Sequence, residues 1–167
     1  LGGSADGFVY IISLNKKESY KQINTPITAI KQILHIKGSN YLMIHAQTKS
    51  IVLIDIKNYK IAHSNYLEFE AEIDNIETIN SELLRVILNN SKELHVEFSS
   101  LAKLKSLIIH NSIYEAYEYV AREPMLVDSK EYLELEDKFD AIYLDALQAL
   151  IKQDKNLLMQ IVDSFIN

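Results

Sequence analysis

ADGFVYIISLNKKESYKQI (residues 5–23) aligns without a gap with QTKSIVLIDIKNYKIAHSN (residues 47–65), at an offset of 42 residues. Apolar positions coincide along the alignment; Val9, for example, falls on Ile51. A third copy, NNSKELHVEF (residues 89–98), follows after one more residue. A period near 42 with four short strands per unit is typical of propeller blades. The sequence therefore predicts a repetitive, sheet-only first part.

Short apolar runs, separated by clusters of Gly, Asn, Ser and Lys, continue to about Leu101 and predict strands. The predicted strands are 7–14, 19–23, 27–36, 41–46, 50–56, 60–67, 73–79, 83–88 and 93–98. The unbroken run at 50–56 is expected of a strand buried on both faces. Asp6–Gly7 is expected to form a two-residue type I′ hairpin. Looser turns are expected in the later copies, at Thr48–Lys49 or Lys49–Ser50 and at Asn90–Ser91.

GGSADGFVYIISL resembles the small-Gly-Ser-x-Asp-Gly-x-Val-x-x-x-Asp signature of WD-repeat blades, and also the DGxLYALD core of quinoprotein-type blades. The tryptophan and most of the Gly-His signature of WD repeats are missing, and the later copies keep only the apolar pattern. The resemblance implies β-propeller blades, mainly antiparallel β, about two and a half of them in residues 1–104. Propellers usually have four or more blades. Because the chain also begins with Leu1 inside a strand, we expect further blades upstream, in a longer protein.

Helical spacing replaces the short runs in the last third of the chain, where we expect an α-helical region over residues 105–167. Three amphipathic helices are predicted, at 111–124, 128–153 and 154–166. The candidate N-caps are Asn111 or Ser112, Asp128 or Ser129, and Asp154; Pro124 is expected to stop the first helix. YEAYEYVAREPML resembles tetratricopeptide-like helical hairpins, although the Trp and Gly of that motif are absent. The resemblance implies antiparallel helix pairs.

No motif for catalysis or cofactor binding is found. The chain has no cysteine, no GxxxxGK[ST] or GxGxxG loop, no HExxH and no GxSxG elbow. We therefore expect no catalytic, cofactor-binding or metal-binding residue. Glu68, Glu70, Glu72 and Asp74 alternate with apolar residues, which fits either a calcium or acid-base cluster or an exposed strand face. His45 and His95 are expected to be structural histidines within strands.

Net charge is −6, and from Ser112 onward 12 acidic residues stand against 5 basic ones. Such a surface repels nucleic acid phosphates, and no apolar stretch is long enough for membrane insertion. The expected partners are proteins, and Tyr114 and Tyr119 are the candidate interaction residues because they face away from the main apolar stripe. Self-association through open propeller edges is an alternative. The expected location is cytoplasmic, or periplasmic if an upstream signal peptide exists.

These expectations favour a non-catalytic protein-interaction scaffold made of a propeller and a helical module. One alternative is a quinoprotein-like propeller enzyme, and another is a periplasmic propeller adaptor. In both alternatives the functional site would lie in upstream blades.

Overall fold

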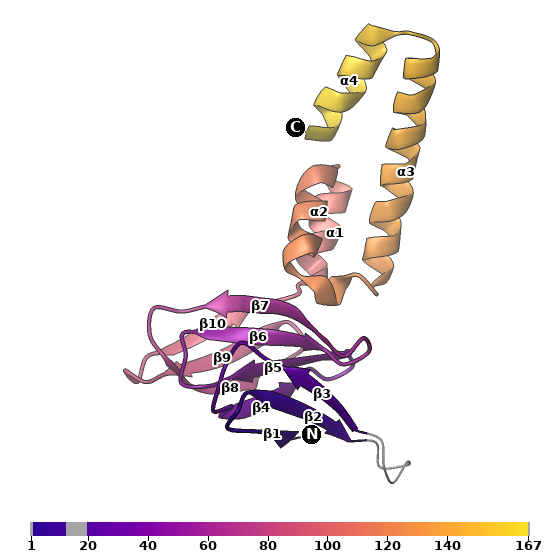
Figure 1. Cartoon of the computed structure of the whole chain (residues 1–167). Helices are drawn as coiled ribbons and strands as arrows, with labels where there is room; N and C mark the ends of the chain where they lie inside the picture. Colours follow the sequence, from indigo (N-terminus) through magenta and orange to yellow (C-terminus); the bar gives the residue numbers. More distant parts are fainter. Residues whose placement is uncertain (1, 13–19, 167) are drawn as a thin grey trace. The chain divides into compact units, whose positions relative to one another are not determined.

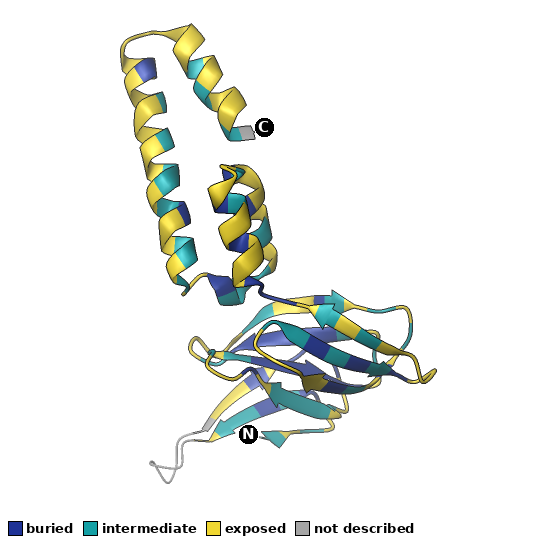
Figure 2. Cartoon of the chain, turned by 180° about the vertical axis from the view of Figure 1, so that it is seen from behind, coloured by how far each residue is buried: buried dark blue, intermediate teal, exposed yellow. Residues whose placement is uncertain are grey.

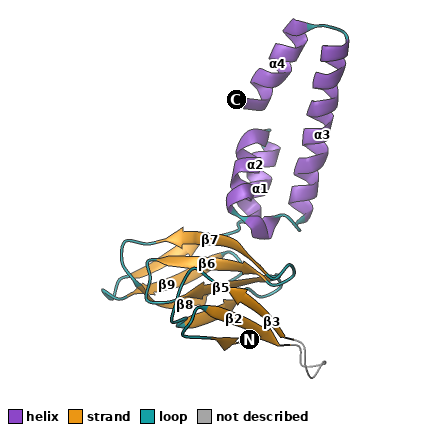
Figure 3. Ribbon diagram, viewed as in Figure 1, coloured by secondary structure: helices purple, strands orange, loops and turns teal. Residues whose placement is uncertain are grey.

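The structure, a computed structural model, describes residues 2–12 and 20–166. It separates into two units, Leu1–Phe98 and Ser99–Asn167. All described strands lie in the first unit and all described helices in the second, so the predicted order of β followed by α is confirmed (Figures 1 and 3). The sequence placed the boundary after residue 104, whereas the observed division comes earlier because a helix already begins at Leu101.

Three antiparallel sheets make up the first unit. The described strands are β1 (Gly2–Gly3), β2 (Phe8–Ile12), β3 (Tyr20–Asn24), β4 (Gln32–His35), β5 (Tyr41–His45), β6 (Ser50–Asp55), β7 (Lys60–Glu68), β8 (Ile73–Thr78), β9 (Leu83–Leu88) and β10 (Glu93–Glu97). The order is β1-β2-β3 in the first sheet, β4-β5-β6-β7 in the middle sheet and β10-β9-β8 in the third sheet. Each predicted strand overlaps an observed one, and β3 and β7 each end one residue beyond the prediction. Residues 13, 14 and 19 of the predictions lie outside the described residues.

The 42-residue repeat is present in the strands themselves. β2 and β3, moved by 42 residues, fall on β6 and β7, and β5 and β6 moved by the same amount fall on β9 and β10. The third copy thus keeps the period without the extra residue that its apolar pattern suggested. Each sheet is therefore a version of the same four-strand unit. Among the described residues, the middle sheet has all four strands, the first sheet lacks the counterpart of β4, and the third sheet lacks the counterpart of β7.

The first hairpin turn differs from the prediction. Gly7 has a φ of +82°, but Asp6 has no positive φ, so the type I′ prediction is wrong. The Gly7 N–H donates to the Ser4 carbonyl and the Ser4 N–H donates to the Phe8 carbonyl. This pattern is a type I turn followed by a left-handed residue, which closes a three-residue loop.

The same turn recurs in the third copy, where a looser one was expected. The Ser91 N–H donates to the Leu88 carbonyl and the Leu88 N–H donates to the Lys92 carbonyl, both at 2.9 Å. Ser91 has a φ of +64° and occupies the place of Gly7 two periods later. The turn geometry is therefore repeated although the glycine is not.

Residues 27–31 were predicted to belong to a strand, and this is wrong. Pro26 has no backbone N–H to give to a sheet. The Thr25 hydroxyl lies 2.7 Å from the Gly7 carbonyl oxygen and 2.9 Å from that of Ile27. Ala29 has a φ of +53°, and its N–H donates to the Ala5 carbonyl. The segment therefore folds over the first hairpin turn instead of extending β4.

The core of the first unit lies around the middle sheet. Ile51, Val52, Leu53 and Ile54 of β6 are all fully buried, as the continuous apolar run predicted. One cluster joins the first and middle sheets; it contains Val9, Ile23, Ile27, Leu42, Ile44, Ala46, Val52 and Ile54.

A partly buried polar link joins the middle and third sheets. The side-chain amide of Gln32 on β4 donates to the Ile76 carbonyl of β8 at 2.8 Å and accepts the Ile76 N–H at 3.0 Å. His45 is fully buried, with Nε2 2.9 Å from Gln32 Oε1 and Nδ1 2.8 Å from the Ala46 carbonyl oxygen. The expectation that His45 is a hydrogen-bonded structural histidine is confirmed.

Acid is expected to weaken the first unit through His45. Burial of the imidazole lowers the pKa of His45. This effect outweighs the hydrogen bond to Ala46, which raises that pKa. The unfolded chain, with a histidine pKa near 6.5, therefore binds the proton first. The contribution of His45 to the free energy of unfolding is fully present above this pH and is lost as the pH is lowered through it. Urea unfolding at about pH 7.5 and about pH 5.5 measures the loss. The difference in the free energy of unfolding between the two pH values should persist in the exposed His63→Gln variant and should be smaller in His45→Gln. An equal difference in the wild type and both variants would contradict the role of His45.

Four α-helices and one short 3₁₀ helix form the described part of the second unit. They are α1 (Leu101–Ile109), α2 (Ile113–Arg122), η1 (Pro124–Leu126), α3 (Lys130–Ile151) and α4 (Lys155–Ile166). The three predicted helices correspond to α2, α3 and α4, and α1 was not predicted. The buried cluster contains Leu104, Ile108, Ile113, Ala116, Val120, Leu126 and Leu135.

Caps fix the ends of these helices. The Ser129 and Asp154 side chains accept N–H groups of α3 and α4, as predicted. Ser112 precedes α2 without a side-chain cap bond, and α2 ends at Arg122, just before Pro124. The Ser100 hydroxyl accepts the Lys103 N–H and so caps α1.

Candidate functional site

An apolar groove of about 150 Å³ lies between α3 and α4. Its lining contains no charged residue and consists of Phe139, Ile142, Tyr143, Ala146, Ile161, Val162 and Phe165. The helical spacing of these side chains places them on the facing sides of the α3–α4 hairpin. All of these residues except Tyr143 belong to the apolar stripes that the sequence predicts for the two helices, but the sequence did not predict the hollow between them.

Aromatic rings build one end of the groove. The Phe139 and Phe165 ring centroids are 5.8 Å apart, and the Tyr143 ring stacks on Phe139 at 6.5 Å. Tyr117 packs edge-on against Phe139 at 5.3 Å. These contacts fix the aromatic wall, because edge-to-face and offset ring pairs hold their relative orientation.

Tyr114, a predicted interaction residue, lies beside this end. Its ring is edge-on to Phe165, with centroids 6.2 Å apart, and its hydroxyl donates to Glu118. Its side chain is 44 % exposed. Hydrogen bonding to Glu118 raises the pKa of Tyr114, so the phenol stays protonated near neutral pH. Tyr114 therefore extends the aromatic wall toward solvent.

Tyr119, the other predicted interaction residue, is tied to α1. Its hydroxyl accepts the Ser100 N–H at 2.9 Å, and the Lys103 ammonium lies 4.5 Å from the ring centroid. Glu123, one turn later, accepts both the N–H and the hydroxyl of Ser99. Tyr119 thus holds the start of α1 against the end of α2, away from the groove. A role of Tyr114 or Tyr119 in partner binding stays a prediction.

Three carboxylates lie near the aromatic end of the groove. Glu118 on α2 accepts the Tyr114 hydroxyl and also pairs with Arg122 at 3.5 Å, and Glu136 and Asp140 on α3 both act on Tyr117. Tyr117 donates to Glu136 at 2.6 Å; burial and this hydrogen bond raise the pKa of Tyr117. The groove is therefore apolar inside and acidic at one end.

Further apolar residues are exposed on α3 and α4, whose ribbons are mostly coloured as exposed in Figure 2. The large ones on these helices are Leu133, Tyr143, Leu144, Leu147, Leu150, Ile151, Leu157, Met159 and Val162. Apolar residues scattered singly are normal at a surface, but a contiguous patch marks a contact surface.

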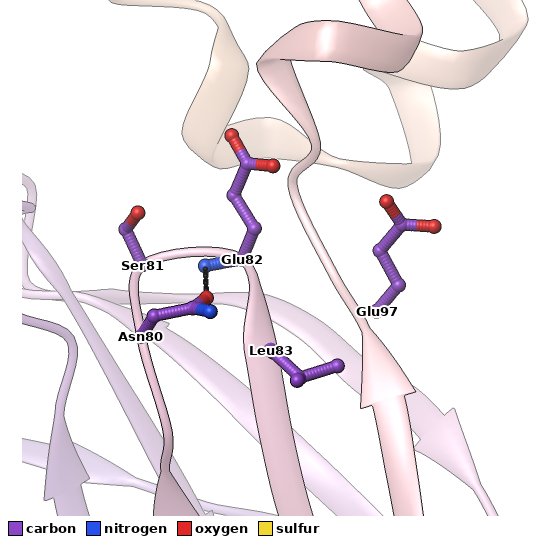
Figure 4. A pocket seen from close by; sticks show the side chains of 5 residues that line it. All are labelled: Asn80, Ser81, Glu82, Leu83 and Glu97. Carbon is purple, nitrogen blue, oxygen red and sulfur yellow. Dashed lines mark hydrogen bonds between the residues drawn. The ribbon is translucent and has the colours of Figure 1, made fainter.

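A second hollow, of about 540 Å³, opens at one end of the third sheet (Figure 4). It is lined by the turn between β8 and β9, which is Asn80 to Glu82, and by Leu83 and Glu97. The Asn80 side chain accepts the Glu82 N–H and so fixes the turn. The Glu82 and Glu97 side chains stand on opposite sides of the hollow. No signal in the sequence brought these two carboxylates together.

The acidic run 68–74 has separate partners for its carboxylates. Glu70 pairs with Lys92, Asp74 pairs with Lys31, and Glu72 accepts the Asn89 side-chain amide. Glu68 ends β7 and Asp74 lies in β8, whereas Glu70 and Glu72 lie between these strands, so the run does not present four carboxylates on one strand face. Across residues 2–12 and 20–166 no group of three or more His, Asp or Glu side chains is arranged to hold a metal ion.

Comparison with known proteins found no matching family model, no similar curated protein and no similar solved structure. In the part of the chain that the structure describes, none of the helices combines the length and apolar character needed to cross a membrane.

Proposed function

We propose that the chain is a non-catalytic protein-interaction scaffold, in which a part built like WD-repeat propeller blades is followed by a helical-hairpin module. The 42-residue repeat of antiparallel strands supports the first half of this proposal. The apolar groove between α3 and α4 is the observation that carries the second half.

The groove fits an amphipathic helix of a partner protein. Its walls offer only apolar and aromatic side chains, and a helix binds such a groove through residues spaced at i, i+3, i+4 and i+7. Glu118, Glu136 and Asp140 at the aromatic end favour lysine or arginine on the helix flank, because unlike charges steer and orient the encounter. The partner segment is therefore apolar on one face and basic at its edge.

Binding of a defined probe tests this proposal. The probe is a fluorescent peptide helix with leucines on one face and lysines beside them, and the readout is fluorescence anisotropy. The wild-type chain should bind it, and Val162→Asp in the groove wall should weaken binding about tenfold or more by placing a charge on the apolar wall. Leu133→Asp is the matched control, since Leu133 is 62 % exposed on α3 and does not line the groove.

Two results would contradict the proposal. One is equal affinity of the Val162→Asp and Leu133→Asp variants for the lysine peptide. The other is equal affinity of the wild-type chain for a peptide with glutamate in place of lysine. Circular dichroism of each variant establishes that the helices are intact.

A further inference from the structure

The outer edge of the third sheet has no strand on it within the described residues. β2 is paired on both sides, by β1 and β3, and β6 is paired on both sides, by β5 and β7. β10 occupies the same place in the repeat as β2 and β6, but it pairs with β9 alone. An edge strand carries a row of backbone donors and acceptors ready for another strand.

The hydrogen bonds of β10 show which residues face this edge. The Leu88 N–H donates to the Lys92 carbonyl, and the Phe98 N–H donates to the Glu82 carbonyl. Because hydrogen-bonded pairs alternate along antiparallel strands, the even-numbered residues of β10 bond to β9. Glu93, His95 and Glu97 therefore direct their backbone N–H and C=O groups toward the open edge.

The two faces of β10 have opposite character. Leu94 and Val96 pair with the fully buried Val86 and Leu84, and both are only half-buried themselves. A strand added at the edge would cover them with apolar side chains of its own.

Glu93 and Glu97 lie on the other face and are exposed. At the place of Glu93, the first and middle sheets have Val9 and Ile51, which are fully buried. Arg85 binds both oxygens of Glu93 at 2.8 Å and also contacts Glu77. Three carboxylates, Glu77, Glu93 and Glu97, stand here with one arginine and with His95, whose Nε2 lies 3.3 Å from Glu93 Oε1, so carboxylates outnumber the basic groups on this face.

The hollow in Figure 4 lies where this face meets the end of the strand. Glu97 is the last residue of β10, and Glu82 precedes β9. Glu97 therefore borders the hollow and also belongs to the edge strand.

We propose that the open edge of β10 binds an extended segment of a partner protein as an added antiparallel strand. The segment alternates apolar residues, which cover Leu94 and Val96, with lysine or arginine residues, which face Glu93 and Glu97. The antiparallel direction follows from β3 and β7, which pair in this way at the equivalent edges of the other two sheets. This surface lies in the first unit and is independent of the helical groove.

A short peptide that alternates lysine and valine, labelled with a fluorophore, is the probe. Its anisotropy should rise to saturation with the wild-type chain. His95→Pro should reduce the affinity about tenfold or more, because proline removes the outward N–H at the centre of the edge, where a proline is tolerated. Glu97→Lys should reduce it several-fold, whereas Asp6→Lys, the same charge change at an exposed turn, should not.

Other occupants give different results. Saturable binding that is lost in His95→Pro and absent with a glutamate-valine peptide supports the proposal. Equal binding of the lysine-valine peptide to the wild-type chain and His95→Pro would overturn it, as would the absence of binding to a folded wild-type chain. A wild-type dimer that His95→Pro converts to a monomer would also overturn it, because the edge would then pair with a second copy of the chain. Hydrogen exchange of β9 in His95→Pro confirms that the third sheet is folded.

Discussion

Gly7→Ala is expected to destabilise the first unit by about 3 kcal/mol. The left-handed φ of +82° costs a residue with a Cβ about 1–2 kcal/mol. A Cβ at Gly7 would in addition lie 2.3 Å from the carbonyl oxygen of Ile27, which is a backbone atom and has no rotamer to escape into. The segment that folds over the first turn would have to move, and its Thr25 bond to the Gly7 carbonyl would be strained. Urea denaturation followed by hydrogen exchange in the strands measures the loss.

Gly38→Ala separates the two causes. Gly38 has a φ of +81°, but a Cβ there would meet nothing within 4 Å. This variant should therefore lose only the conformational part, about 1–2 kcal/mol. If Gly7→Ala and Gly38→Ala lost the same amount, the close approach of Ile27 to the first turn would not be a determinant of stability.

Leu135→Ala is expected to destabilise the helical unit by about 3 kcal/mol. Leu135 is fully buried and belongs to the cluster formed by residues of α1, α2, η1 and α3. Truncation removes the transfer free energy of the lost carbons and leaves a cavity that rigid helices fill only in part. Hydrogen exchange of peptides from α1 and α2 should show faster opening, since these helices share the cluster.

Leu133→Ala provides the matched control on the same helix. Leu133 is 62 % exposed and lies two residues from Leu135, so the helix propensity change is the same. Its stability should stay within about 0.5 kcal/mol of the wild type. Equal losses in both variants would mean that the cluster does not hold α3 to α1 and α2.

Strand positions could be predicted from the sequence because apolar runs of five to eight residues alternate with breaks. The run at β6 was correctly interpreted as buried on both faces, since no polar residue interrupts Ile51 to Ile54. The strand prediction for residues 27–31 was wrong because their Ile and Ala residues are typical of a strand. The hydrogen bonds that decide the conformation are made to the carbonyls of Gly7 and Ala5, more than fifteen residues earlier. Apolar pattern alone does not report such long-range hydrogen bonds.

The third repeat shows another limit. Apolar matching shifted it by one residue, because Leu94 was placed where Val9 and Ile51 stand. The turns at Gly7 and Ser91 show that Glu93 has that place. The apolar pattern of the third copy differs because the face that is buried at Val9 and Ile51 is exposed at Glu93. Matching by hydrophobicity therefore aligned residues from opposite faces of the strand.

The helical unit was predicted apart from α1. This helix has nine residues, of which only Leu104 and Ile108 are buried, and that is too short a stripe to stand out. For the candidate site, the sequence indicated Tyr114 and Tyr119 as exposed aromatics. It did not indicate that the Tyr119 hydroxyl bonds to Ser100, nor that Phe139 and Phe165 enclose a groove, because both depend on packing between helices.

The side chain of Gln32 presents to Ile76 one donor and one acceptor, which is the complement that a peptide unit of a neighbouring strand would present. The Gln32 amide therefore connects the middle sheet to the third sheet by hydrogen bonds, although the two sheets share no strand. Apolar packing has no preferred direction, whereas the two directional hydrogen bonds between one amide and one peptide unit are lost together when the sheets separate. The cooperative unit of folding in this half of the chain is therefore expected to span at least two repeats, with the middle and third sheets opening in one step.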